Sequence, residues 1–156
     1  MEMDLIERVG ITEDELIELC EKVRLENEVE KYRVKMQALL DALRDIEEIL
    51  TSVAEEAQIK NVEYEDIEIK KVAWRFGSGR VYEYRLFVRG KLIPPEIDKI
   101  DTSTYVYGDF NNYVEYADVQ DILYLAENIE TFIQEFKEKL EERNETIDEL
   151  LKKFNF

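Results

Sequence analysis

The chain has 156 residues, of which 45% are hydrophobic and 38% are charged, and its formal net charge is −17. This length suits one folded domain, and the apolar fraction argues against a disordered chain. The acidic balance argues against binding nucleic acid or an anionic membrane through the bulk surface.

The missing residue types narrow the chemistry further. The chain has no histidine, and Cys20 is the lone cysteine. The usual general base, the usual metal ligand and every Ser/His or Cys/His nucleophile pair are therefore absent, and no intramolecular disulfide can form. No apolar run is long enough to span a membrane, and the N-terminus does not follow the pattern of a secretion signal. We expect a soluble cytoplasmic protein that is not an enzyme and that needs no cofactor. Its high content of Glu and Lys is also typical of thermophiles.

The first predicted helix begins after Thr12. The string from Thr12 to Glu15 has the spacing of a capping box, in which each residue's side chain bonds the other's backbone N–H. Apolar residues follow at helical spacing. Residues 1–24 are therefore predicted to be an N-terminal helical extension, with a kink or a separate short helix near 24–28.

Two longer segments carry apolar residues at alternating steps of four and three. They cover residues 25–57 and 118–154. Such steps over more than four heptads are typical of a coiled coil, and Asp118 with Asp121 is predicted to cap the second helix. Both seams are roughly 50 Å long at the α-helical rise. Their matched lengths suggest an antiparallel pair.

Between the helices the hydrophobic period changes to two. The segment 77–79 is predicted to be a three-residue hairpin loop, which would pair Phe76 with Arg80 and Trp74 with Tyr82. A second hairpin is predicted over 103–116. The expected fold is therefore α+β, with two long antiparallel coiled-coil helices bracketing a small antiparallel sheet of two hairpins. Residues 62–116 supply the hairpins, and the whole chain 1–156 forms one domain.

Basic residues gather between positions 70 and 91, where Glu83 is the single acidic residue. One interpretation is a docking face for an acidic partner, another copy of this chain included. The other is that these side chains lie over the acidic helices or face water, where exposed ion pairs stabilise little. The basic residues expected to serve docking include Lys71, Arg75, Arg85 and Arg89.

The C-terminus is a second candidate site. In an antiparallel pair, its apolar residues would occupy the free end of the helical hairpin and could hold a non-native chain or a partner protein. Alternatively, residues 1–24 fold over this end and bury it. The residues expected to bind a client are Ile147, Leu150, Leu151, Phe154 and Phe156.

Metal binding is not expected. Asp98, Asp101 and Asp109 lie in predicted loops, but their spacing is not that of a calcium loop. They are interpreted as solvated loop residues.

The order helix, two hairpins, helix resembles an alpha-type prefoldin subunit. The string 86–92 is similar to that family's strand entering its first turn, and 105–108 with 113–115 resembles its second hairpin. The longer basic strand, the extra residues 1–24 and the Pro94–Pro95 pair depart from the family. The resemblance implies a hexameric, ATP-independent holdase in which the sheets join subunits and the coil tips hold unfolded protein. In that scheme the hairpin residues around Trp74 and Tyr82 serve assembly, and residues 147–156 hold clients.

Two functional hypotheses follow from these observations. The first is a coiled-coil chaperone-like or assembly protein that acts in a homo- or hetero-oligomer and holds a non-native or partner protein. The second is an acidic inhibitor or adaptor, of viral or plasmid type, that blocks a basic nucleic-acid-binding protein. Salt distinguishes them, because charge-driven binding weakens steeply with salt whereas apolar burial does not. A purely structural coiled-coil component of a larger particle is a third option.

Overall fold

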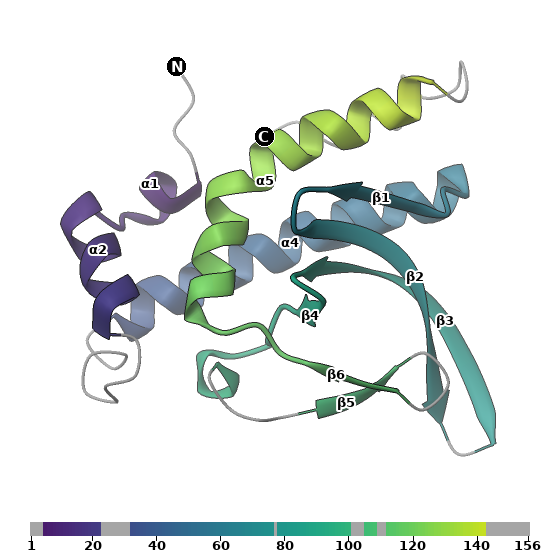
Figure 1. Ribbon diagram of the computed structural model, residues 1–156, viewed down its shortest axis with the longest axis horizontal. Helices are drawn as coiled ribbons and strands as arrows, with labels where there is room; N and C mark the ends of the chain where they lie inside the picture. The colour runs from purple at the N-terminus through teal and green to yellow at the C-terminus, as the bar shows by residue number, and fades with distance from the viewer. Residues whose placement is uncertain (1–4, 23–31, 77, 101–104, 109–111, 143–156) are drawn as a thin grey trace.

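The computed structural model describes residues 5–22, 32–76, 78–100, 105–108 and 112–142 (Figure 1). Its elements mix helices with antiparallel strands, so the fold is α+β. In chain order they are α1 (Leu5–Val9), α2 (Glu13–Lys22), α4 (Arg33–Ala57), β1 (Asn61–Tyr64), β2 (Ile67–Phe76), β3 (Gly79–Val88), β4 (Lys91–Leu92), the 3-10 helix η1 (Ile97–Lys99), β5 (Tyr105–Gly108), β6 (Asn112–Glu115) and α5 (Val119–Glu141).

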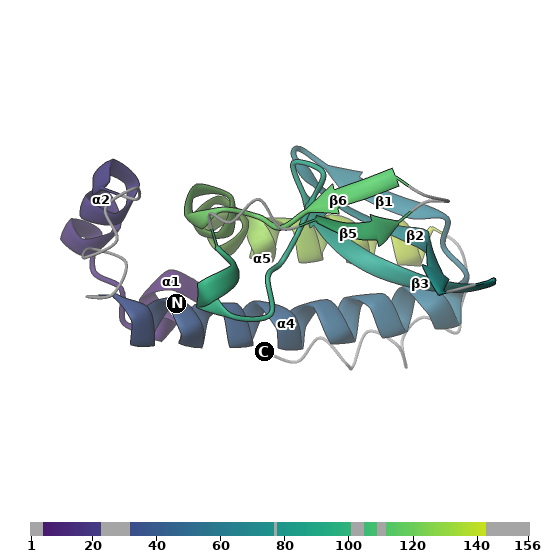
Figure 2. The same ribbon diagram turned by 90° about the horizontal axis from the view of Figure 1, so that it is seen from below.

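The molecule has three layers around a four-stranded sheet with the order β1–β2–β3–β4. Helices α4 and α5 pack on one face, against Ile67, Ile69 and Leu86. The hairpin β5–β6 lies toward the other face (Figure 2), where Val72 and Trp74 form a second, smaller core. The alternation of side chains along β2 and β3 therefore supplies both cores.

Helix α4 is buried along a stripe wider than a two-helix seam. Adjacent residues such as Leu39 and Leu40 are both fully buried, because the stripe contacts the sheet, α1 and α5 together. The helix ends at Gln58, whose left-handed φ of 54° turns the chain toward β1.

The predicted coiled coil is therefore wrong. Helices α4 and α5 share one core with the sheet, and they run in the same general direction instead of antiparallel (Figures 1 and 2). The reason is the return path of the chain. Ala117 donates its backbone N–H to the carbonyl oxygen of Leu92 at 2.7 Å, which starts α5 near the end of β4. Of the two predicted coiled-coil segments, the structure shows helix over 33–57 and 119–141. Residues 23–31, which include the predicted kink, and residues 143–156 lie outside the described residues.

Both predicted helix caps are present. At α5, Asp118 accepts from the backbone N–H of Asp121, and Asp121 accepts from that of Asp118. Ahead of α2, Thr12 and Glu15 exchange the same pair of bonds at 3.2 Å each. The short helix α1 precedes them and packs against α4 and α5.

The sheet has more turns than the sequence pattern predicts. A two-residue turn with Glu65 at a φ of 52° separates β1 from β2. Another, at Arg89 and Gly90 with φ values of 51° and 75°, separates β3 from β4. Because each turn has two residues, the alternation of apolar and polar residues continues through it without a shift. The hydrophobic pattern therefore does not reveal the turn.

The register of the central hairpin also differs from the prediction. Phe76 pairs with Gly79, and Trp74 pairs with Val81. The connection is therefore two residues long, not three. This one-residue shift moves Tyr82 to the face opposite Trp74.

Candidate functional site

A buried carboxylate joins α4 to the outer edge of β3, the edge that faces away from β2. Glu47 is 7% exposed, and its Oε2 accepts from the backbone N–H of Leu86 at 2.9 Å and from Nε of Arg85 at 3.1 Å. Among the described strands, none lies beside Leu86 on this side, because β4 pairs only with Phe87 and Val88. Glu47 therefore supplies the acceptor that a longer β4 would have supplied.

Beyond Leu86 this edge has no strand partner in the described part of the chain. Backbone groups of alternate residues in an antiparallel strand point to the same side. Since the N–H of Leu86 points away from β2, those of Tyr84 and Tyr82 point away from it too. Val81 and Tyr82 on the same stretch are 49% and 52% exposed. An open strand edge beside exposed apolar side chains is a template for pairing with another chain.

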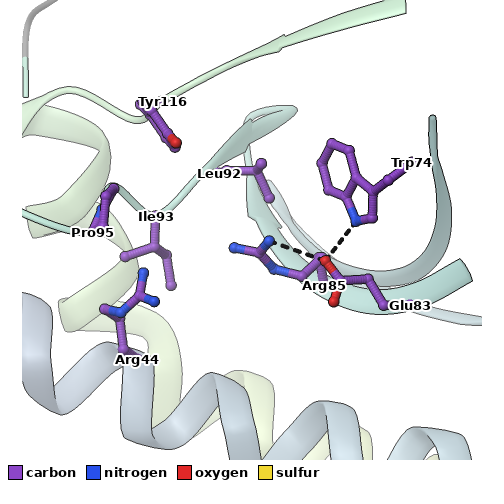
Figure 3. Close-up of a pocket in the computed structure, with 8 residues that line it drawn as sticks. All are labelled: Arg44, Trp74, Glu83, Arg85, Leu92, Ile93, Pro95 and Tyr116. Carbon is purple, nitrogen blue, oxygen red and sulfur yellow. Dashed lines mark hydrogen bonds and ion pairs between the residues drawn. The ribbon is translucent and has the colours of Figure 1, made fainter. Parts of the chain in front are cut away.

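Two hollows border this edge and share Arg44, Glu83 and Arg85. The first has a volume of about 290 Å³ and lies beside the segment that follows β4, next to Ile93 and Pro95 (Figure 3). The second has a volume of about 400 Å³ and lies between α4 and β3. The first is lined by Arg44, Trp74, Glu83, Arg85, Leu92, Ile93, Pro95 and Tyr116, the second by Arg44, Asp45, Glu47, Glu48, Thr51, Glu83, Tyr84 and Arg85.

The wall of the first hollow is held in a fixed arrangement. Trp74 Nε1 donates to Glu83 Oε1 at 2.5 Å, and Arg85 Nη1 donates to the same oxygen at 3.3 Å. Burial alone would lower the pKa of Arg85, but Glu47 and then Glu83 outweigh burial and raise it, so the guanidinium stays charged. Arg44 reaches the hollow from α4 beside Ile93 (Figure 3) and forms no ion pair with any described residue.

The second hollow has an excess of negative charge. It contains four carboxylates against two guanidiniums, and Glu47 and Glu83 both pair with Arg85. Asp45 and Glu48 are exposed, and their side chains have no ion-pair partner among the residues described. This hollow can therefore accept a cationic side chain.

A second ion cluster stabilises the start of α5. Asp121 is 2% exposed and accepts from Arg89 Nη1 and Lys91 Nζ at 3.0 Å each. Burial would raise the pKa of Asp121, but Lys91, the backbone of Asp118 and Arg89 outweigh it, so the pKa lies below its usual value. This cluster joins the β3–β4 turn to the helix.

The predicted docking residues do not form one surface. Trp74 is buried in the second core, Arg85 pairs with Glu47 and Glu83, and Arg89 pairs with Asp121. Lys71 lies over the rings of Tyr82 and Tyr84. The ion pairs of Arg85 with Glu47 in α4 and of Arg89 with Asp121 in α5 fit the alternative that these side chains lie over the acidic helices. The side chain of Arg75 lies outside the described residues.

The predicted client residues lie in 143–156, outside the described residues. Of the loop carboxylates, Asp98 pairs with Arg33 at 2.6 Å, and Asp101 and Asp109 are also outside the description. Within the described ranges, no group of three or more acidic or cysteine side chains is placed to hold a metal ion. No described helix is long and apolar enough to cross a membrane.

Sequence reasoning missed the residues that shape this site. Glu47 lies within the apolar stripe of α4, between Leu43 and Leu50, and an acidic residue in such a stripe is a signal of a buried bond. Arg44 and Tyr116 carry no comparable signal, because their roles depend on how the chain leaves β4.

Comparisons with protein-family models, with curated proteins and with solved structures found no match to this chain. The resemblance to prefoldin therefore stays a prediction.

Proposed function

We propose that this chain is a non-enzymatic, chaperone-like or assembly protein that holds an extended segment of a non-native or partner protein. The observation that carries the proposal is the outer edge of β3, where the backbone of Tyr82 and Tyr84 has no strand partner in the described residues. Strand addition to an open edge is a recurring mode of peptide recognition, in which main-chain hydrogen bonds give affinity. The exposed side chains of Val81 and Tyr82 add apolar contact area at the same place.

Only part of this edge is covered by a strand in the described residues. Native proteins usually protect an edge with a charge, a proline or a short strand. Here β4 is two residues long and covers only the far end of the ten-residue strand β3. The hairpin therefore extends past its covering strand, and the outward backbone groups of Tyr82 and Tyr84 have no strand partner in the described part of the chain.

A proline substitution tests this proposal. Tyr82→Pro removes an N–H that points outward and leaves the bonds between β2 and β3 intact, because proline is tolerated on an outward-facing edge. The assay is light scattering from a denatured protein diluted into buffer, at low salt and at about 0.5 M salt, where apolar burial and main-chain bonds persist. We expect the wild-type chain to suppress aggregation at both salts and Tyr82→Pro to lose most of that activity.

The matched control is Tyr82→Ala, which removes the ring but keeps the N–H. It should retain part of the activity, and circular dichroism should show that both variants fold. Failure of the wild-type chain to suppress aggregation at either salt would contradict the proposal, as would full activity of Tyr82→Pro.

A second candidate is an acidic inhibitor of a basic, nucleic-acid-binding protein. It is favoured by the outer face of α4, where Asp41, Asp45, Glu48 and Glu55 are all exposed and lie on one side of the helix. This function predicts binding that weakens steeply between 50 and about 200 mM salt. Replacing Asp41 and Glu55 with lysine should abolish such binding, whereas strand-edge binding should persist.

A further inference from the structure

We infer that the segment bound along β3 alternates apolar and basic side chains, with the apolar ones entering the hollow beside Trp74 and the basic ones facing Asp45 and Glu48 on α4. This inference rests on the proposed function and specifies the chemistry of the partner.

The position of the bound segment, called the guest strand below, follows from the position of β4. Strand β4 pairs with Phe87 and Val88, and its pairing ends at Leu92, two residues before Pro94. A guest in line with β4 would begin past Leu86, whose N–H is already bonded to Glu47. It would pair with Tyr84 and then with Tyr82, which have matching outward groups.

The two faces of the guest meet different surroundings. Successive side chains of a strand point to opposite faces. On the face of Trp74 and Glu83 lies the first hollow, whose apolar walls come from Leu92, Ile93 and Tyr116. Its volume of about 290 Å³ suits one aliphatic or aromatic side chain.

On the opposite face, the guest side chain lies beside Tyr84 and α4. The second hollow there contains the carboxylates of Asp45 and Glu48, which have no ion-pair partner among the described residues. Arg44 also lines this hollow, but the carboxylates outnumber the guanidiniums, so a lysine or arginine fits the excess negative charge better than an acidic side chain does. The net charge of −17 on the chain also favours encounter with a basic segment.

Three fluorescent peptides of equal length test this pattern against the full-length chain by anisotropy. The first alternates valine and lysine, the second has the same composition with valines and lysines in separate blocks, and the third replaces lysine with glutamate. We expect the first to bind about tenfold more tightly than the second, and the third to bind most weakly. Equal affinity of all three peptides would overturn the inference.

A charge-matched pair of variants locates the basic contact. Asp45→Asn with Glu48→Gln should weaken the alternating peptide about tenfold and reduce the salt dependence of binding. Asp41→Asn with Glu55→Gln changes the net charge equally, away from the hollow, and should have little effect. Equal effects of the two pairs would show that only net charge matters and would overturn the assignment.

Tyr82→Pro distinguishes strand addition to β3 from the preference for an alternating apolar and basic segment. It should abolish binding of the alternating peptide if the guest pairs with β3. Unchanged binding would overturn the proposed function and the inference together. If Tyr82→Pro loses binding but the wild-type chain binds the lysine and glutamate peptides equally, the inference alone is overturned.

Discussion

Removing the carboxylate of Glu47 should destabilise the protein more than any other single polar change described above. In Glu47→Ala the N–H of Leu86 loses its acceptor in a buried position, which costs about 1–3 kcal/mol. Arg85, whose side chain is 22% exposed, loses one of its two carboxylates and keeps Glu83 at 3.3 Å. Breaking a fully buried pair costs about 3–5 kcal/mol, and the remaining partner and partial exposure reduce that cost. We expect a total loss of about 2–4 kcal/mol in the free energy of unfolding.

The conservative variant separates the hydrogen bond from the charge. Glu47→Gln keeps an oxygen that can accept from Leu86 and removes only the charge facing Arg85. Its cost should be smaller, at about 1–2 kcal/mol. Urea unfolding followed by circular dichroism measures both losses, with an unchanged m-value showing that the unfolded state is unaffected.

A double-mutant cycle with Arg85→Met then measures the coupling between the two side chains. We expect a coupling of about 1–2 kcal/mol, within the range for contacting residues. Glu47→Ala losing less than about 0.5 kcal/mol, the range of an ordinary surface change, would refute the reasoning. Equal losses in Glu47→Ala and Glu47→Gln would refute the role of the Leu86 bond.

Three further outcomes test the fold. Because the pKa of Asp121 is lowered in the folded protein, its ionised carboxylate stabilises the fold above the usual carboxyl pKa, and this stability is lost as the pH falls through the lower folded value. The urea midpoint of unfolding should therefore drop with acidification, and it should drop less in Asp121→Asn. Gly90→Ala should cost about 1 kcal/mol, because the site at φ 75° has open space for a Cβ but strains an L residue; thermal unfolding checks this. Phe136→Ala should cost about 3–5 kcal/mol because the ring is fully buried, whereas Val34→Ala, 83% exposed, should change stability by less than about 0.5 kcal/mol. A larger loss in Val34→Ala would contradict the described packing of α4.

The parts of the fold that local chemistry determines could be predicted. The capping boxes at Thr12 and Asp118 depend on residues three apart, and both are present. The helical stripes and the period of two between them were also visible. These signals require no knowledge of what lies across the core.

The parts that depend on distant contacts could not be predicted. The apolar stripe of α4 shows that the helix is covered, but a sheet and a second helix leave the same stripe. The predicted register at 77–79 was wrong because a loop of two residues and a loop of three residues both fit this sequence. The glycine at each end is compatible with either turn. The candidate site depends on where the chain turns away after β4 and on Glu47 reaching Leu86, and neither has a local signature other than an acid in an apolar stripe.

The open edge of β3 is tested most directly by amide hydrogen exchange, read residue by residue by NMR with and without the alternating peptide. The N–H groups of Val81 and Glu83 point toward β2, so they should be protected in the free protein. Those of Tyr82 and Tyr84 should exchange quickly in the free protein and become protected when the peptide saturates it. Protection of Tyr82 and Tyr84 in the free protein, or their fast exchange at saturating peptide, would contradict the account.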